Sequence, residues 1–326
     1  MTERFARWWE RWEAFWDERE HPISLACVRI LLGVCLLYDF LHLWRLGLVI
    51  PLFGVAAAGG FSDALMRDNT PWIYLLLPGT AGAARLHHTI LVLSAVTLTA
   101  GFFTRSSATV LVLAWAQFAA VEPYADRGID TLGRLALCIL AVSGAGETLS
   151  LDALVRTGSF WGDGRPISAA PRRLMILQLV TMYFGAGMQK VGMTWWPMGH
   201  FGALYFALQD PAVAAHDFTF LRRQPFFFLS QVGTAGTMLY QLTYPLVLVL
   251  FWWRRHPERG GRIADFARRW HLEWLWIVTG GIFHLSLAMT MNLGIFPWAM
   301  LALYPAWITP DRMSRAFSRA ARWARA

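Results

Sequence analysis

Lysine is almost absent from the chain, although the chain is basic. Of its 29 Lys+Arg residues only Lys190 is a lysine, and the formal net charge is +8. Arginine stays charged in proteins, whereas the pKa of a lysine moves readily on burial. The single amine is therefore the first candidate for proton chemistry.

Charged residues as a whole are scarce. They make up 15% of the chain, and apolar residues make up 56%, whereas a soluble domain has about 25% charged residues. The apolar residues gather in long runs such as 89–103, 110–121 and 242–253, which is typical of a polytopic membrane protein. Because most arginines flank these runs, the positive charge indicates membrane orientation rather than a nucleic-acid partner.

Several chemical signatures are missing as well. The sequence has no Gly-rich phosphate loop, no HExxH or CxxC motif, and no serine in a nucleophile elbow. Cys27, Cys35 and Cys138 lie in apolar runs without metal or redox spacing, and we expect them to be small buried side chains. The sequence therefore predicts no metal site. The charged first 20 residues do not resemble a cleavable signal peptide.

The apolar runs predict an all-α integral membrane protein with about eight transmembrane helices. Residues 23–309 would form the transmembrane domain, and residues 310–326 a basic cytoplasmic tail. We expect spans near residues 24–44, 88–103, 107–121, 131–146, 174–190, 229–253, 273–292 and 296–308.

Residues 1–22 form a separate segment in which aromatic side chains recur at spacings of three and four opposite arginines. This pattern predicts an amphipathic helix. The helix either lies in the headgroup layer as an interfacial helix or packs on the protein's own cytoplasmic face.

The arginines also predict the orientation. Eight spans place both termini on one side, and most arginines outside the spans fall on that side. By the positive-inside rule the termini are cytoplasmic, in a multi-pass protein of a bacterial inner membrane. Lys190 and the long connections 47–86 and 191–228 then lie at the outer face.

Tyr183, Gly187 and Lys190 are spaced four and three residues apart at the end of the fifth span, so they share one helix face. Gly185 and Gly187 let a second helix or a flat ligand approach the backbone closely. Two interpretations stay open. The stripe either binds a ligand beside a phenol and an amine, or it is a packing seam below a lysine that reaches the outer interface.

His284 lies near the middle of the seventh span, one turn after two glycines. An imidazole at this depth must hydrogen-bond a partner. It is either a site residue or a structural link to a neighbouring helix.

Acidic side chains at the outer ends of spans also need partners. At the start of the fourth span Asp130 and Arg134 are four residues apart, and we expect an ion pair that holds the helix mouth. Asp39 lies deep in the first span, and Arg45 and His42 are its nearest candidate partners in the sequence.

These features give residues 24–309 a resemblance to the HTTM family, the membrane domain related to vitamin K-dependent gamma-carboxylase. The most specific stretch runs from Tyr183 to Lys190, with the Trp195 that follows. Further matching positions are Arg29 to Gly33, Gly101 with Thr104 and Arg105, Ser150 to Asp152, and Phe283 with His284.

The resemblance implies a site for a reduced naphthoquinone of the vitamin K type, which is soluble in the lipid bilayer. Lys190 matches the catalytic base of the carboxylase, and Tyr183 and His284 match residues of its hydroquinone pocket. We expect Gly187, Trp195, Asp130 and Arg134 at the same ligand site. The resemblance further implies that Lys190 deprotonates the reduced naphthoquinone and that oxygen then adds to it. The resulting oxidised quinone species would be basic enough to remove a γ-proton from a glutamate of a peptide or protein substrate at the outer face, and the carbanion would take up carbon dioxide.

Two functions follow as hypotheses. In the first, the chain binds and oxidises the quinol, and carboxylation of a glutamate substrate stays a separate question, because Ile129 and Asp130 stand where the carboxylase has an asparagine-histidine pair. In the second, the chain is a non-catalytic membrane protein that binds lipid or serves peptide export or immunity. Lys190 is then structural or pairs with an anionic headgroup.

Overall fold

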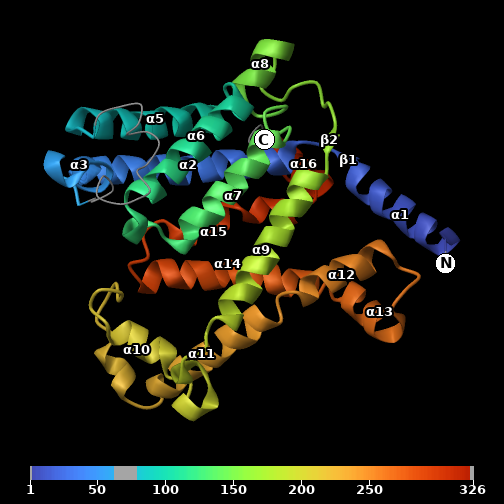
Figure 1. The fold of residues 1–326 in the computed structure, drawn as a ribbon. Helices are drawn as coiled ribbons and strands as arrows, with labels where there is room; N and C mark the ends of the chain where they lie inside the picture. The colour runs from blue at the N-terminus through green and yellow to red at the C-terminus, as the bar shows by residue number, and fades with distance from the viewer. Residues whose placement is uncertain (1, 62–78, 324–326) are drawn as a thin grey trace. The chain divides into compact units, whose positions relative to one another are not determined.

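The computed structural model describes residues 2–61 and 79–323. It is built almost entirely of helices (Figure 1). The chain divides into two compact units, a first unit of residues 1–175 with 302–326 and a second unit of residues 176–301. Because both units are built almost entirely of helices, the predicted all-α fold class is confirmed.

The first unit contains most of the long apolar helices. Three of them, α2, α5 and α6, pack on one another in chain order, and α7 follows against α6. Among the described residues, the α-helices of this unit are α1 (Thr2–Asp17), α2 (Ile23–Arg45), α3 (Val49–Phe53), α5 (Ala81–Ala100), α6 (Thr104–Val121), α7 (Gly128–Val142), α8 (Leu151–Thr157) and α16 (Pro310–Trp323). Its 3-10 turns are η1 (Ala56–Ala58), η3 (Pro123–Ala125) and η7 (Tyr304–Trp307).

Helix α9 (Ala170–Met188) begins in the first unit and continues into the second unit. Its connection 191–228 consists of short pieces, η4 (Met193–Trp195), η5 (Pro197–Gly199), α10 (Ala203–Gln209) and η6 (Thr219–Arg222). The longer helices are α11 (Phe226–Leu242), α12 (Leu246–Arg255), α13 (Gly261–Arg269) and α14 (Glu273–Thr290), and α15 (Phe296–Ala302) follows at the end of the unit.

Small residues let the helices of the first unit pack closely. A Cβ atom at Gly33 in α2 would lie 2.4 Å from Oγ1 of Thr99 in α5. One at Gly133 in α7 would lie 2.6 Å from the Trp115 ring of α6. Gly33 thus lets α2 and α5 approach each other closely, and Gly133 makes room for the Trp115 ring against α7.

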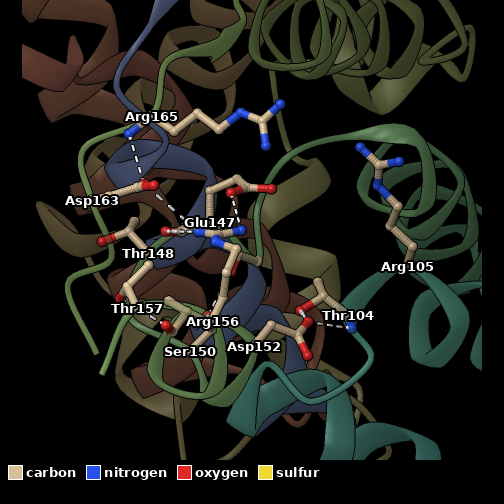
Figure 2. A network of polar contacts seen from close by, with 12 residues as sticks. Thr104, Arg105, Glu147, Thr148, Ser150, Asp152, Arg156, Thr157, Asp163 and Arg165 are labelled. Carbon is tan, nitrogen blue, oxygen red and sulfur yellow. Dashed lines mark hydrogen bonds and ion pairs between the residues drawn. The ribbon is translucent and has the colours of Figure 1, made fainter. Parts of the chain in front are cut away.

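A buried arginine packs against the turn between α5 and α6. Arg29 of α2 is fully buried, and its guanidinium donates a hydrogen bond to the Leu149 carbonyl. Gly101, which has a φ of +68°, leaves room for this guanidinium. Asp152 closes the same region, because its carboxylate accepts hydrogen bonds of 2.8 Å from the backbone nitrogen and the hydroxyl of Thr104 (Figure 2).

The number of membrane spans is the point at which the structure departs from the sequence expectation. Within residues 2–61 and 79–323, two helices, α2 and α5, are long and apolar enough to cross a bilayer. The pairs α11–α12 and α13–α14 are bent by 51° and 50°, and the number rises to four if each pair is one span. Eight spans are thus not confirmed.

The physical reasons for this difference are local. Pro245 interrupts the predicted span 229–253 and divides it into α11 and α12. The predicted span 296–308 becomes α15, which has 7 residues, and the separate turn η7. A helix needs roughly 20 residues to cross the hydrocarbon layer.

The ends of the chain contain one expected and one unexpected element. The predicted N-terminal helix is present as α1. It is followed by β1 (Arg19–Glu20), which pairs antiparallel with β2 (Ile167–Ser168). This short two-stranded ladder was not predicted from the sequence. Arg172 fixes this ladder by donating two hydrogen bonds of 2.7 Å to the Glu20 carboxylate.

Connection 47–86 contains short helical segments, α3 and η1, and its residues 62–78 lie outside the described residues. The expectation of buried cysteines is wrong for Cys138, which is exposed, whereas Cys27 and Cys35 are half-buried. Cys138 lies on a face of α7 that is not packed against protein.

Candidate functional site

Two of the predicted site residues meet in the second unit. Tyr183 of α9 and His284 of α14 are 1% and 0% exposed. The Tyr183 hydroxyl lies 2.5 Å from Nε2 of His284, within hydrogen-bonding distance. The imidazole therefore has the partner that its depth in an apolar helix requires.

Aromatic rings enclose this hydrogen bond. The Tyr244 ring is stacked on the Tyr183 ring with a centroid separation of 4.2 Å, and the Tyr240 ring meets it edge-on at 5.4 Å. The Phe296 ring lies 5.6 Å from the His284 ring. The phenol and the imidazole are thus held away from water among flat apolar faces, where a polar contact is stronger than in water.

Gly187 is the point at which α9 and α11 approach each other. A Cβ atom at Gly187 would lie 3.1 Å from Cβ of Gln241 and 3.3 Å from the backbone nitrogen of Leu242. A helix therefore occupies the space that this glycine leaves free. This close approach fits the packing-seam interpretation at Gly187, and a ligand role of this glycine stays a prediction. At Gly185 nothing lies within 4 Å of the same position.

Gln241 of α11 is a polar residue beside Gly187 that was not selected as a site residue from the sequence. It is 5% exposed, and its Oε1 atom has no hydrogen-bond partner among the described residues. An unsatisfied buried acceptor costs roughly 1–3 kcal/mol. The oxygen is therefore a place for an incoming N–H or O–H donor. Its position next to Tyr240 on an apolar helix was the one signal in the sequence.

Lys190 lies two residues beyond the end of α9, in the connection that follows the helix. Its Nζ atom donates a 3.0 Å hydrogen bond to the Ala186 carbonyl and lies 4.9 Å from the centre of the Trp195 ring. Burial lowers the pKa of the Lys190 amine from its ordinary value. Its backbone nitrogen donates to the Gly187 carbonyl at 3.2 Å, so Lys190 and Gln241 both contact Gly187.

The expected ion pair between Asp130 and Arg134 is not formed. Asp130 is fully buried and accepts hydrogen bonds from the side chain of Arg127, the residue before α7, at 2.9 and 3.0 Å. Arg134 instead binds both carboxylate oxygens of Asp126, at 2.7 and 2.8 Å. The reason is that the Asp130 carboxylate turns back to the first residues of α7, whereas Arg134 lies one turn further on.

Arg127 also provides the partner of Asp39. The distance from Arg127 to the Asp39 carboxylate is 2.8 Å, so the expected partners Arg45 and His42 are not used. Burial lowers the pKa of Arg127, but the hydrogen bond to Asp130 and the charge of Asp39 outweigh it and raise this pKa. Within residues 2–61 and 79–323, no group of three or more His, Cys, Asp or Glu residues is placed to hold a metal ion.

The predicted site residues therefore fall into two groups. Tyr183, Gly187, Lys190, Trp195 and His284 belong to the second unit. Asp130 and Arg134 belong to the first unit, where they form structural ion pairs.

The sequence of the chain matches one known protein family. The sequence model of the HTTM domain matches residues 18–252, which is more than half of the chain. The chain belongs to the HTTM family. It is thus a membrane protein whose domain is related to the vitamin K-dependent carboxylase family. The HTTM match includes the stretch from Tyr183 to Trp195 and ends before His284. No curated protein and no solved structure matched the chain.

Proposed function

We propose that this HTTM protein binds a reduced naphthoquinone from the bilayer and oxidises it, with Lys190 as the general base and dioxygen as the electron acceptor. The observation that carries the proposal is the contact at Gly187. There the backbone nitrogen of Lys190, the chain's one lysine, bonds the Gly187 carbonyl, and Gln241 packs beside the same glycine. The buried amide oxygen of Gln241 has no hydrogen-bond partner among the described residues.

The residues around Gly187 fit a quinol. Its hydroxyl group is the type of donor that the Gln241 oxygen lacks, and its flat ring suits a cluster of Tyr183, Tyr240 and Tyr244. When bound, a reduced quinone supplies an ionisable hydroxyl and two electrons. Tyr183 and His284 hold each other through their hydrogen bond and would position such a ring.

Lys190 has the two properties that a base needs. Its amine is half-buried, and burial favours the neutral form that accepts a proton. In the structure Nζ is bound to the Ala186 carbonyl. To act as a base, the amine would give up this bond and direct its lone pair at the hydroxyl proton.

The membrane setting is part of the proposal. We place the protein in a bacterial inner membrane with about eight spans and cytoplasmic termini. A lipid-soluble quinone would then reach the second unit from the bilayer. Carboxylation of a glutamate in a peptide or protein substrate at the outer face would be a further step of the same chemistry.

A second candidate function rests on the contacts of Lys190 itself. A carbonyl at 3.0 Å and an aromatic face at 4.9 Å are also the surroundings of a structural ammonium group. In that case the chain is a non-catalytic membrane protein that binds lipid or serves peptide export or immunity, and Lys190 caps α9 or pairs with an anionic headgroup.

The test is oxygen-dependent oxidation of a reduced naphthoquinone by the purified protein in lipid nanodiscs. The proposal expects turnover that is lost in Lys190→Ala and kept in Gln189→Ala, a change of the exposed neighbouring side chain. Thermal unfolding of each variant shows that it is folded. Equal background oxidation by the unmodified protein and by Lys190→Ala would exclude quinol oxidation and leave the non-catalytic function.

A further inference from the structure

The helix α13 exposes an apolar stripe. Ile263, Phe266 and Trp270, the last being the residue after the helix, are spaced three and four residues apart and therefore share one face. They are 72%, 58% and 65% exposed. Ala264 and Ala267, on the adjoining face, are buried. The small residues pack α13 on its own unit, and the large apolar residues point away from the protein.

Positive charge lies along the other edge of this stripe. Arg262 and Arg269 are exposed, are seven residues apart, and have no ion-pair partner among the described residues. The two acidic residues nearest to them in the chain are already used, because Asp265 pairs with Arg268 and Glu273 pairs with Arg254. Residues 254–273 contain six arginines and three acidic residues. The edge of the stripe thus has cationic groups that are free for an anion.

The direction of α13 fits a helix that lies along a membrane surface. It joins α14 at a bend of 50°, where His271 has a φ of +51°. The chain therefore turns away from the axis of the apolar helix α14. A helix with an apolar face, a cationic edge and such a bend is the arrangement of an interfacial helix.

We infer that α13 is a membrane anchor that inserts Ile263, Phe266 and Trp270 at the headgroup boundary of a leaflet containing anionic phospholipid, and that Arg262 and Arg269 bind its phosphate groups. The two arginines favour anionic lipid, because a cationic side chain near an anionic leaflet is attracted to the negative charge of its headgroups. The apolar stripe supplies the insertion. This role is independent of the proposed quinol chemistry.

Nitroxide labels on two faces of α13 test the insertion. After Cys27, Cys35 and Cys138 are replaced by alanine, a label is placed at Phe266→Cys or at Asp265→Cys, and the protein is reconstituted in liposomes. At position 266 we expect frequent collisions with dioxygen and few with a water-soluble nickel chelate, and at position 265 the reverse. Equal exposure of both labels to the chelate would overturn the inference. So would shielding of the label at 266 from both reagents, which indicates a protein partner.

The choice of lipid is tested with the same label at position 266. Replacing zwitterionic lipid by phosphatidylglycerol should lower the mobility of the nitroxide in the unmodified background. This change should disappear in Arg262→Gln/Arg269→Gln and remain in Arg315→Gln/Arg319→Gln, which removes the same charge from exposed positions of α16. A lipid effect that is unchanged in the first double variant, or no lipid effect at all, would contradict the assignment of the two arginines.

Discussion

The Tyr183 hydroxyl and Nε2 of His284 lie 2.5 Å apart and join α9 to α14 across 101 positions of the sequence. Both residues are buried inside the second unit. The contact explains how an imidazole is accommodated in the apolar helix α14, because a polar group in such surroundings must be hydrogen-bonded. It also places two polar side chains, a phenol and an imidazole, in the same aromatic cluster.

Removing this hydrogen bond should destabilise the protein. Tyr183→Phe keeps the ring and its stacking on Tyr244 but deletes the hydroxyl, and we expect a loss of about 1 kcal/mol. Thermal unfolding in detergent measures the effect. Tyr240→Phe is the matched control, because the Tyr240 hydroxyl donates a longer bond of 3.3 Å to the Trp276 carbonyl. A larger effect of the control would contradict the importance of the Tyr183–His284 bond.

Gly101→Ala should be more damaging than an ordinary glycine substitution. The new Cβ atom would lie 1.6 Å from Nη1 of Arg29 and 2.4 Å from Cβ of Ser150. The φ of +68° adds a backbone penalty, so the free energy of unfolding should fall by roughly 3 kcal/mol. Gly158→Ala has a similar φ of +74° but nothing within 4 Å, and it should cost about 1 kcal/mol. If chemical denaturation shows the same loss of unfolding free energy in both variants, the contact with Arg29 does not contribute to the cost of Gly101→Ala.

Arg127→Gln should destabilise the first unit more than Arg134→Gln. Arg127 neutralises Asp39 and Asp130, both of which are buried, although its own side chain is partly exposed. Leaving both carboxylates without this partner should cost about 2 kcal/mol. Arg134→Gln affects the single, more exposed Asp126, and we expect about 1 kcal/mol. The unfolding temperatures of the two variants give the comparison, and the opposite order would be inconsistent with the network.

The sequence allowed the prediction of the helices and of single site residues, but not of most contacts. Apolar periodicity and arginine distribution indicated the helical membrane fold, and the scarcity of lysine selected Lys190. A helix face can be predicted from spacing, whereas its partner depends on the packing of distant segments. For this reason the pairing of Asp39 with Arg127, 88 positions away, was missed.

The ends of the spans could not be predicted for a different reason. Hydropathy averages over a window, so the division at Pro245 and the turn at His271 do not interrupt the apolar signal. The unsatisfied oxygen of Gln241 is likewise invisible in the sequence, because it depends on what α9 places against α11.

The lowered pKa of Lys190 predicts the pH dependence of its chemical modification. An amine reacts with acylating reagents only in its neutral form. Because burial lowers the pKa of this amine, the neutral form should appear at a lower pH than for a free lysine. Peptide mass spectrometry after brief acylation at a series of pH values follows the reaction of Lys190 separately from that of the α-amino group, the other amine of the chain.

Denatured protein is the control for this measurement. Its Lys190 should react with the pH dependence of an ordinary lysine, so the native profile should lie to the acid side. A native profile displaced to higher pH would show that the Ala186 carbonyl and the Trp195 ring stabilise the ammonium form more than burial destabilises it.

The most direct test of the central claim is the rate of quinol oxidation by Lys190→Arg in nanodiscs, measured beside the unmodified protein. Arginine keeps the positive charge and can still donate to the Ala186 carbonyl, but it does not accept a proton at neutral pH. If Lys190 is the base, the folded variant should lose oxygen-dependent turnover by about 100-fold or more. Turnover at the unmodified rate in Lys190→Arg would contradict the account, because a charge alone would then be sufficient.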